Sequence, residues 1–393
     1  MDKSKWEYKK LGDCCKVING LWTGKKPPFI NVGVIRNANF TKSCELDNSN
    51  IAYIDVEQKA FEKRKLIKGD IIIEKSGGSD KQPVGRPILF NMDGDFSFSN
   101  FTSTLRVEDC KHLDSKYLHK VLKYNYLMGH TKAMQSNTTG LHNLDFTKYK
   151  AQIIPIPSFA DQQRIVAELD CLNEMIALKQ EQLKEFDKLA QSIFYDMFGE
   201  GDWESRKIKE IAKVKIGPFG SSLHQYDYVT GGTPLVNPIH MINGKIVVDN
   251  DFTITEEKKS ELTSYLLKTN DIVFGRRGDI GRCALVTDKE NGYLCGTGSM
   301  FVRFDIDIDP TYALCELSSK EIKKYLLDNA KGATMLNLNG GIVENITIPL
   351  PPLDLQQQFA EKIQAIEAQK ELVKKSIAET QQLLDSRMDF YFN

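Results

Sequence analysis

The sequence predicts an α+β protein, in which two mixed α/β globular domains alternate with two long helices that pack as an antiparallel coiled coil. Three observations predict this fold class. Two distant segments are near copies, each copy continues as a long heptad pattern, and the stretches before the copies also resemble each other. The chain is therefore expected to form a pseudo-twofold internal repeat. The predicted order is first domain, first helix, second domain and second helix, at residues 1–152, 153–199, 200–346 and 347–393.

The near copies align without a gap when residues 154–198 are placed on 348–392, and ten of these 45 positions are identical. Both begin with the lead-in I-P-x-P, which is followed after four residues by two glutamines. Proline ends any earlier helix at this point. Ser158 with Asp161 fits a capping box, and Asp354 is the expected cap of the second helix. Each copy is thus expected to begin a helix at the same point of the repeat.

Apolar residues in each predicted helix recur at alternating steps of four and three, which is typical of a coiled-coil seam. Lys179 and Lys370 interrupt the two seams at different heights and are expected to fix the register. Because the first helix delivers the chain to the segment where the second begins, helices that pack side by side must run antiparallel. The predicted seam consists of Ile165, Leu169, Leu172, Ile176, Leu183, Phe186 and Ile193 in the first helix, and of Phe359, Ile363, Ile366, Val373, Ile377 and Leu384 in the second.

The segments that precede the helices share short blocks of sequence. "WEYKKLGDCCKVING" matches "WESRKIKEIAKVKIG", "KGDIIIEKSGG" matches "TNDIVFGRRGD", and "VGRPILF" matches "IGRCALV". In each segment a β-branched run, at 71–73 or 272–274, leads into a basic, glycine-rich loop. A helical stretch follows, at 115–127 or 312–329. Each segment is therefore predicted to fold as a mixed α/β domain.

This organisation resembles the specificity (S) subunit of type I restriction–modification enzymes. The resemblance is carried by "IPIPSFADQQRIV", "IPLPPLDLQQQF", "IGPFGSSLHQYDYVTGGTPLV" and the loops "GDIII…GR" and "NDIVFGRRGDIGR". It implies that the globules are target recognition domains, each reading one half of a bipartite, asymmetric target on double-stranded DNA. It also implies that the helices fix the spacing and dock two modification (methyltransferase) subunits. Motor-nuclease restriction subunits are implied in the full complex, with S-adenosylmethionine bound by the modification subunit rather than by this chain.

The sequence shows no pattern of a catalytic, metal or cofactor site. "GLWTGKK" lacks the Ser or Thr of a phosphate loop, the six histidines show no metal spacing, and the eight cysteines form no CxxC pair. No run of 18 apolar residues exists, and the N-terminal stretch is polar. We therefore expect a cytoplasmic, non-catalytic chain that neither crosses a membrane nor holds a cofactor. A self-contained DNA adenine methyltransferase and a non-DNA protein-interaction scaffold remain as alternatives.

The net charge of −1 hides an uneven distribution. Residues 161–198 carry eight acidic and four basic side chains, and residues 354–393 carry seven and five, so the remainder of the chain is net positive. Between Lys59 and Arg86, eight basic residues accompany four acidic ones. Because local patches rather than total charge govern contact with phosphates, the acidic helices do not exclude DNA binding by the globules.

The candidate DNA-binding residues lie in the repeated loops. Arginine can donate two hydrogen bonds to guanine O6 and N7, and serine hydroxyls commonly contact phosphates. Arg86 and Arg282 each follow a glycine in a repeated block, which leaves a structural role open for both. The candidates are Arg36, Asn37, Asn39, Lys75, Lys81 and Arg86 in the first domain, and Ser221, Ser222, Arg276, Arg277 and Arg282 in the second.

Overall fold

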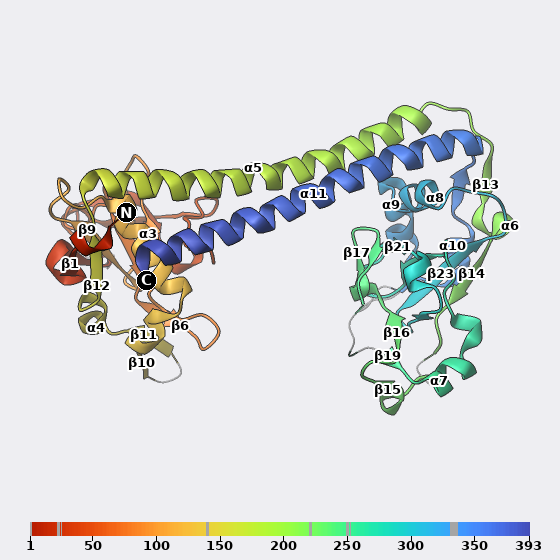
Figure 1. Ribbon diagram of the computed structural model, residues 1–393, viewed down its shortest axis with the longest axis horizontal. Helices are drawn as coiled ribbons and strands as arrows, with labels where there is room; N and C mark the ends of the chain where they lie inside the picture. Colours follow the sequence, from red (N-terminus) through yellow and green to blue (C-terminus); the bar gives the residue numbers. More distant parts are fainter. Residues whose placement is uncertain are drawn as a thin grey trace. The chain divides into compact units, whose positions relative to one another are not determined.

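The computed structural model describes residues 2–21, 24, 26–138, 141–219, 222–248, 251, 253–330 and 337–393. The chain divides into two compact units, Met1–Gln180 with Lys375–Asn393 and Glu181–Lys374. Each unit contains one globular domain and portions of both long helices (Figure 1). A unit is therefore made from two parts of the chain that are distant in sequence.

The first domain is built on an antiparallel sheet in the order β2-β9-β5-β7. A second sheet, β4-β3-β8, pairs β3 with β8 in parallel, and a third has the order β10-β11-β6. The strands are β1 (Glu7–Lys10), β2 (Cys15–Asn19), β3 (Phe29–Ile35), β4 (Ala52–Glu57), β5 (Ile71–Glu74), β6 (Ser76–Gly78), β7 (Pro87–Leu89), β8 (Phe96–Phe98), β9 (Thr102–Val107), β10 (Gln135–Thr138), β11 (Leu141–Leu144) and β12 (Ile153–Ile156). The helices are α1 (Leu11–Cys14), α2 (Gln58–Glu62), α3 (Ser115–Leu127) and α4 (Phe146–Lys150).

The second domain repeats this plan. Its main sheet has the order β14-β23-β20-β21, and β16 pairs with β22 in parallel within the sheet β15-β19-β16-β22. The strands are β13 (Ser205–Lys207), β14 (Ala212–Ile216), β15 (Tyr228–Val229), β16 (Thr233–Val236), β17 (Met241–Ile242), β18 (Lys245–Ile246), β19 (Thr253–Ile254), β20 (Ile272–Gly275), β21 (Cys283–Leu285), β22 (Leu294–Cys295), β23 (Ser299–Phe304) and β24 (Thr347–Pro349). The helices are α6 (Ile208–Ile211), α7 (Glu256–Glu261), α8 (Pro310–Leu317), α9 (Lys320–Asn329) and α10 (Gly340–Glu344).

The first three residues of each central strand, 71–73 of β5 and 272–274 of β20, are apolar because both faces of the strand are covered. Ile71 and Ile73 of β5 enter one core cluster, whereas Ile72 enters another. The equivalent strand β20 divides its residues in the same way between two clusters. The two predicted strands are therefore confirmed, and their unbroken β-branched or aromatic runs reflect burial on both sides.

An identical ion pair fixes the start of both central strands. Arg106 donates to both carboxylate oxygens of Asp70 at 2.7 Å, and Arg303 donates to those of Asp271 at 2.7 and 2.6 Å. Each aspartate is nearly inaccessible to solvent and also accepts a backbone N–H from three residues earlier. The repeat thus extends to individual buried contacts.

The helix prediction is correct in the first domain and partly wrong in the second. Helix α3 covers Ser115–Leu127 as expected, but the stretch at 312–329 forms two helices, α8 and α9. The break falls at Ser318 and Ser319, and the hydroxyl of Ser319 accepts the N–H of Ile322 at 3.2 Å. Serine caps a new helix here because its side chain satisfies a backbone donor that the helix itself leaves free.

The two long helices are α5 (Phe159–Phe198) and α11 (Leu353–Phe392), each of 40 residues. In the first unit the start of α5 and the end of α11 pack into the core of the domain, through Leu169 and Leu384 among others. In the second unit Phe198 near the end of α5 packs with Phe359 near the start of α11 (Figure 1). The helices are thus antiparallel within each unit, and the predicted fold class is confirmed. Asp354 was wrongly expected as a cap, since α11 already begins at Leu353.

The predicted seam residues are all at least partly shielded from solvent. Ile165, Leu169, Leu172, Phe359, Ile366 and Leu384 are buried, and Ile176, Leu183, Phe186, Ile193, Ile363, Val373 and Ile377 are half-buried. Lys179 bridges the helices by donating to the hydroxyls of Ser376 at 2.7 Å and Thr380 at 3.0 Å. Lys370 pairs instead with Asp187 at 2.8 Å. The two seam lysines therefore have different partners, as a register device requires.

The repeated I-P-x-P and glutamine lead-in joins each long helix to its own domain. Gln162 is fully buried, donates to the Pro157 carbonyl at 2.9 Å and accepts the N–H of Asp114 at 2.8 Å. Asp114 caps α3, so one glutamine side chain connects the starts of two helices. Gln356 makes the matching bonds to the carbonyl of Pro351 at 2.8 Å and the N–H of Asp309 at 2.9 Å. The lead-in occurs twice in the sequence because each domain uses the same hydrogen bonds to attach its long helix.

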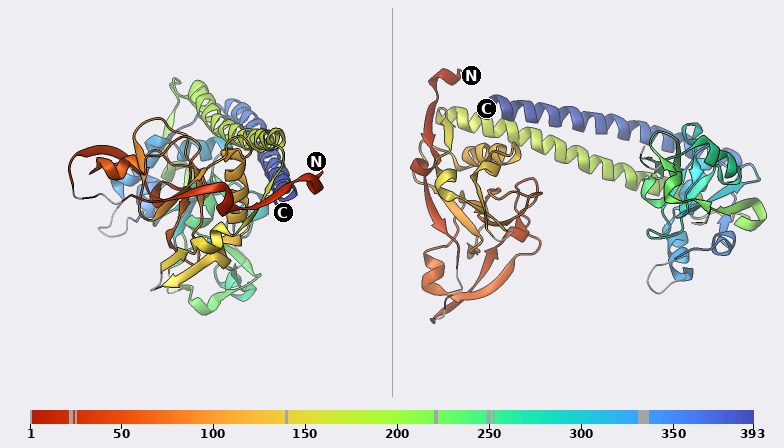
Figure 2. Two further views of the ribbon diagram at one scale, coloured as in Figure 1. Left: turned by 90° about the vertical axis from the view of Figure 1, so that its left-hand side faces the viewer. Right: turned by 90° about the horizontal axis from the view of Figure 1, so that it is seen from below.

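The first unit also brings the two chain ends together. The Lys3 ammonium donates to the Asn393 carbonyl at 3.1 Å and lies 5.3 Å from the centre of the Phe390 ring. Figure 2 shows the N and C labels beside each other in its right-hand view.

Candidate nucleic-acid interface

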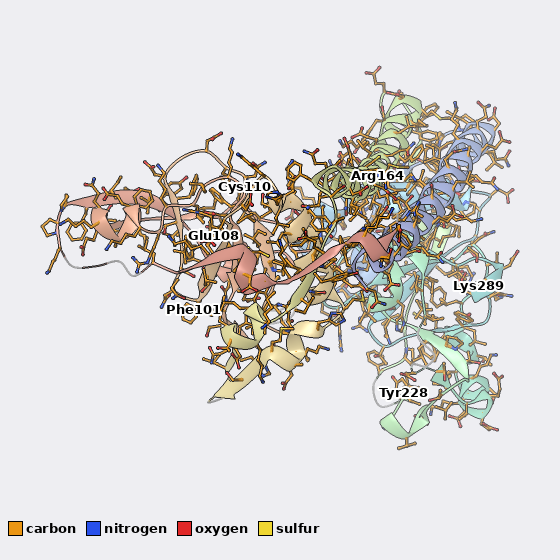
Figure 3. The ribbon with its side chains drawn as sticks, turned by 60° about the vertical axis from the view of Figure 1, so that its left-hand side comes forward. Phe101, Glu108, Cys110, Arg164, Tyr228 and Lys289 are labelled. Atoms are coloured by element: carbon orange, nitrogen blue, oxygen red, sulfur yellow. The ribbon has the colours of Figure 1, made fainter. Side chains whose placement is uncertain are left out.

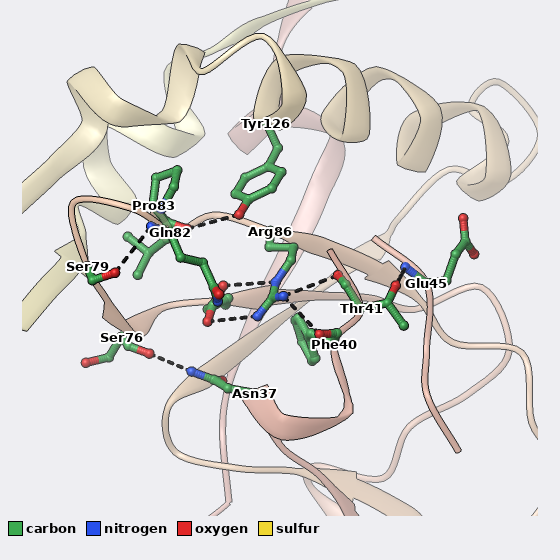
Figure 4. Close-up of polar contacts among 12 residues, drawn as sticks. Asn37, Phe40, Thr41, Glu45, Ser76, Ser79, Gln82, Pro83, Arg86 and Tyr126 are labelled. Atoms are coloured by element: carbon green, nitrogen blue, oxygen red, sulfur yellow. Dashed lines mark hydrogen bonds and ion pairs between the residues drawn. The ribbon is translucent and has the colours of Figure 1, made fainter. Parts of the chain in front are cut away.

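Two loops meet at the same place in each domain. In the first domain these are residues 36–41 after β3 and 75–82 after β5, and the Asn37 side chain donates to the Ser76 carbonyl at 2.7 Å (Figure 4). In the second domain they are residues 237–240 after β16 and 276–282 after β20. The Arg282 guanidinium donates there to the Pro238 carbonyl at 3.2 Å. The loops are adjacent because β3 and β5, like β16 and β20, end at neighbouring points of their sheets.

The turn after β3 is shaped by Asn39, which is 1 % exposed. Its side-chain oxygen accepts the N–H of Arg36 at 3.0 Å, and its amide donates to the carbonyls of Asp47 and Asn50. Asn37 is half-buried and held by Ser76, whereas Arg36 is exposed. Of these three predicted residues, Arg36 presents its side chain most openly to a ligand.

Arg86 lies inside the first domain and holds the loop 36–41 in place (Figure 4). It donates to both oxygens of Glu74 at 3.2 Å and to the carbonyls of Phe40 at 2.9 Å and Thr41 at 3.2 Å. Burial raises the pKa of the Glu74 carboxyl, and the nearby Arg86 partly offsets this. The guanidinium is occupied by protein groups, so the geometry supports the structural role that the sequence left open.

The loop after β5 offers two lysines and a neighbouring aromatic ring. Lys75 is half-buried and Lys81 is exposed. The Phe101 carbonyl accepts the N–H of Lys75 at 2.9 Å, and the Phe101 side chain is exposed at the surface (Figure 3). Sequence reasoning missed Phe101 because nothing in the local pattern marks an exposed aromatic residue.

The basic stretch 59–86 is partly neutralised within the first domain. Lys65 pairs with Asp95 at 2.6 Å and Lys68 with Asp93 at 2.7 Å. Together with the internal Arg86, these pairs reduce the charge available to a ligand. The excess of positive charge read from the sequence therefore overstates the local patch.

The second domain has a more open arrangement of arginines. The loops 237–240 and 276–282, with Thr297 and Gly298, line a surface hollow of about 450 Å³. Arg277 is exposed in this hollow, and Arg282 is half-buried and pairs with Asp279. Arg276 is buried, donates to the Asn337 side chain at 3.2 Å, and has its pKa lowered by burial and by the neighbouring Arg277. No carboxylate in the part of the chain that is described pairs with Arg276 or Arg277.

One of the two predicted serines, Ser222, is among the residues that the structure describes. Ser221 lies outside the described residues. Ser222 is half-buried, and its N–H donates to the Phe219 carbonyl at 2.8 Å. Phe219 and Tyr226, which the sequence reasoning did not select, are strongly exposed at 66 % and 80 %. Their exposure comes from the path of a loop, which residue type alone does not reveal.

The described segments show neither a metal-binding cluster nor a membrane-spanning helix. No group of three or more His, Cys, Asp or Glu side chains there is arranged to hold a metal ion. None of the helices that could be assessed is both long and apolar enough to cross a membrane.

The fold and paired loops define a protein with two similar recognition domains joined to an antiparallel pair of helices. The chain belongs to the type I restriction modification DNA specificity domain family, whose model matches residues 3–187 and 200–382. It is 22 % identical to the type I restriction enzyme MjaVIII specificity subunit of Methanocaldococcus jannaschii, over 92 % of this chain and 86 % of that protein.

Solved structures support the same fold. One, described as the structural basis of complex assembly and conformational transition of the type I R-M system, is 17 % identical with a TM-score of 0.64, covering 99 % of this chain and 97 % of that one. The S subunit of a type I restriction–modification system from M. genitalium is 16 % identical with a TM-score of 0.55, covering 99 % and 96 %. The family resemblance inferred from the sequence is confirmed.

Proposed function

We propose that this chain is the DNA sequence-recognition subunit of a type I restriction–modification complex, and that each globular domain reads one half of a bipartite, asymmetric target. The observation that carries this proposal is a repeated frame with different loop residues. The Asp70 and Asp271 ion pairs are the same in both domains, whereas the loop residues Arg36 and Arg277 occupy different positions of the repeat. Equal frames with unequal reading loops suit two half-sites of different sequence.

The long helices are proposed to fix the spacing of the half-sites and to dock two modification subunits. Besides Gln163 and Gln357, four positions that are identical in the two helix copies are exposed rather than part of the seam. The first unit presents them as Leu178, Glu379, Leu383 and Ser386, and the second unit presents the equivalent set Leu372, Glu185, Leu189 and Ser192. Exposed residues that recur in each unit favour two copies of one partner.

The remaining assignments follow from this role. The chain is proposed to be non-catalytic and cytoplasmic, with S-adenosylmethionine bound by the modification subunits and with motor-nuclease subunits joining for cleavage. The acidic helices leave DNA contact to the globules, and the modest basic patches imply that partner subunits add to DNA affinity.

Domain exchange tests this proposal. Residues 200–346 are replaced by the equivalent domain of another specificity subunit, the hybrid is co-expressed with its modification subunit, and methylated sites are read by single-molecule sequencing. We expect one half of the target to change and the other to persist. A change in both halves would contradict the division of labour between the domains.

Two controls address the alternative functions. Crosslinking of labelled S-adenosylmethionine to the purified chain alone would support a self-contained methyltransferase. Retention of the partner without any preference for DNA in a gel shift would support an interaction scaffold.

A further inference from the structure

The arginines of the two domains differ sharply in whether their side chains are already engaged. The sequence contains eleven arginines, and all but two have a side-chain hydrogen bond or ion pair with another described residue. The engaged ones are Arg64, Arg86, Arg106, Arg164, Arg206, Arg276, Arg282, Arg303 and Arg387. The two whose guanidinium groups have no partner among the described residues are Arg36 and Arg277.

These two arginines lie in different domains, but each lies at the pair of loops that is equivalent in the two domains. Arg36 lies on the loop after β3, and Arg277 lies on the loop after β20, which is the partner loop in the repeated pair. The side chain of Asn37 links the two loops in the first domain, as that of Arg282 does in the second. Each domain thus presents one open guanidinium at its paired loops, although from opposite members of the pair.

We propose that Arg36 and Arg277 are specificity-determining residues, each bonding O6 and N7 of a guanine in its own half-site. The inference rests on the proposed function and deepens it, because it predicts a G·C pair in each half of the target. Arginine suits this task because its planar fork matches the two acceptors on the major-groove edge of guanine.

The surroundings favour a base edge over a phosphate. Asp279 lies on the same loop as Arg277, and Asp80 lies on the loop that is paired with the loop of Arg36. A carboxylate at either place repels phosphate but can accept from the N4 amine of cytosine. Ile239 is 70 % exposed on the rim of the hollow beside Arg277, where an apolar side chain can contact a thymine methyl group.

The loop backbone also leaves room for a close approach. Gly278, next to Arg277, has φ of +75° and no atom within 4 Å of where a Cβ would lie. A side chain at this position would stand in the space that a base edge needs. In the first domain Gly77 has φ of +98°, and only the Asn37 amide lies near, at 3.2 Å.

The test uses the chain co-expressed with its modification subunit, with methylated sites read by single-molecule sequencing. In the Arg277→Ala complex we expect relaxed choice at a guanine in one half-site, with discrimination against other bases reduced on the order of 10- to 100-fold. Arg36→Ala should relax a guanine in the other half only. Lys289→Ala and Lys116→Ala, which remove exposed lysines elsewhere on the same two domains, should leave the target unchanged.

A second variant separates base reading from charge. Arg277→Lys keeps the positive charge but loses the planar fork, so binding to random-sequence DNA should persist while discrimination at the guanine falls. The proposal is overturned if either half-site of the wild-type target lacks a G·C pair, or if the alanine variants leave the target unchanged. Equal weakening on every sequence, restored by lysine, would identify phosphate contacts and also overturn it.

Failure of the proposed function would look different. In that case the wild-type complex would not methylate a bipartite target at all.

Discussion

The two globular domains share a frame but neutralise the arginine of the repeated Gly-Arg block in different ways. In the first domain, Arg86 and Glu74 form an ion pair whose side chains are 4 % and 1 % exposed. In the second domain Gly275 takes the position of Glu74, and Arg282 pairs with Asp279, with side chains 38 % and 50 % exposed. Both arginines hold the preceding turn through a backbone carbonyl. The difference shows that an arginine can hold the neighbouring turn in place whether its ion pair is buried or exposed to solvent.

The exposure of the ion pair to solvent determines how much the pair contributes to the stability of its domain. Removing one partner of a buried pair leaves an uncompensated charge in a poorly solvated place, whereas water replaces a missing partner at the surface. The first reading loop is therefore fixed by the interior of its domain. The second is held by a contact that water can compete for.

The largest expected effect is on stability in the first domain. Glu74→Ala should lower the free energy of unfolding by about 3–5 kcal/mol, because Arg86 loses its buried counter-ion. Asp279→Ala, the matched change in the second domain, should cost about 0–1 kcal/mol. Calorimetric unfolding of the two variants measures both losses of unfolding free energy. The double change Glu74→Met with Arg86→Met should recover much of the loss, and equal losses in the single variants would remove the contrast between the domains.

A smaller effect is expected at the joint between domain and helix, and it should be somewhat larger at Gln162, which also donates to the His112 carbonyl at 2.7 Å. Gln162→Ala and Gln356→Ala should each cost about 1–3 kcal/mol, because buried carbonyl and N–H groups lose their partner. The neighbouring exposed glutamines provide the control, and Gln163→Ala and Gln357→Ala should stay within about 0.5 kcal/mol of the original. Urea denaturation measures these differences. Equal losses at Gln162 and Gln356 would show that the additional contact with His112 adds no stability.

A pH effect is expected from Glu316 in the second domain, at a position where the first domain has no carboxyl group. Burial, with a further contribution from Glu321, raises the pKa of Glu316 to about 7, while the equivalent position in the first domain is the buried Val121. The folded carboxyl keeps its proton up to about pH 7, whereas the unfolded one releases it near its ordinary pKa of 4.5. The contribution of Glu316 to stability should therefore decline as the pH rises from about 4.5 to 7.

The variant Glu316→Val should remove this decline. Melting temperatures measured between pH 4.5 and 8 provide the comparison, with the original chain losing more than the variant over this interval. Parallel pH profiles for the two proteins would contradict the assignment.

The smallest effect on stability is expected on the exposed helix faces. Replacing Leu178 and Leu383 of the first unit with serine, or Leu372 and Leu189 of the second, should change unfolding by about 0.5 kcal/mol or less. Each pair should nevertheless weaken binding of one modification subunit, which native mass spectrometry of the complex would detect. If both doubly substituted chains still bind two modification subunits, the repeated leucines do not form the docking surfaces.

Much of the fold could be predicted because its signals are local in sequence. The heptad spacing of α5 and α11, the apolar runs of β5 and β20 and the duplicated lead-in each follow from neighbouring residues. The break between α8 and α9 was missed because residues at 312–329 keep a helical pattern across Ser318 and Ser319. There a serine cap outweighs the periodicity.

The candidate site could be predicted only in part. The sequence directed attention to the loops after the central strands, but it could not separate open arginines from engaged ones. Arg86 is engaged by Glu74, twelve residues away, and by Phe40, 46 residues away. Phe101, Phe219 and Tyr226 were missed because their exposure depends on how each loop leaves its sheet.

By itself the sequence determined the repeat, the two long helices and the family, because periodicity and duplicated blocks are written in the order of residues. Only the tertiary structure decided which charged side chains remain available for a ligand. Ion pairing and burial depend on residues that folding brings together from distant parts of the chain, and that is why the repeated Gly-Arg block yields a buried pair in one domain and a solvated pair in the other.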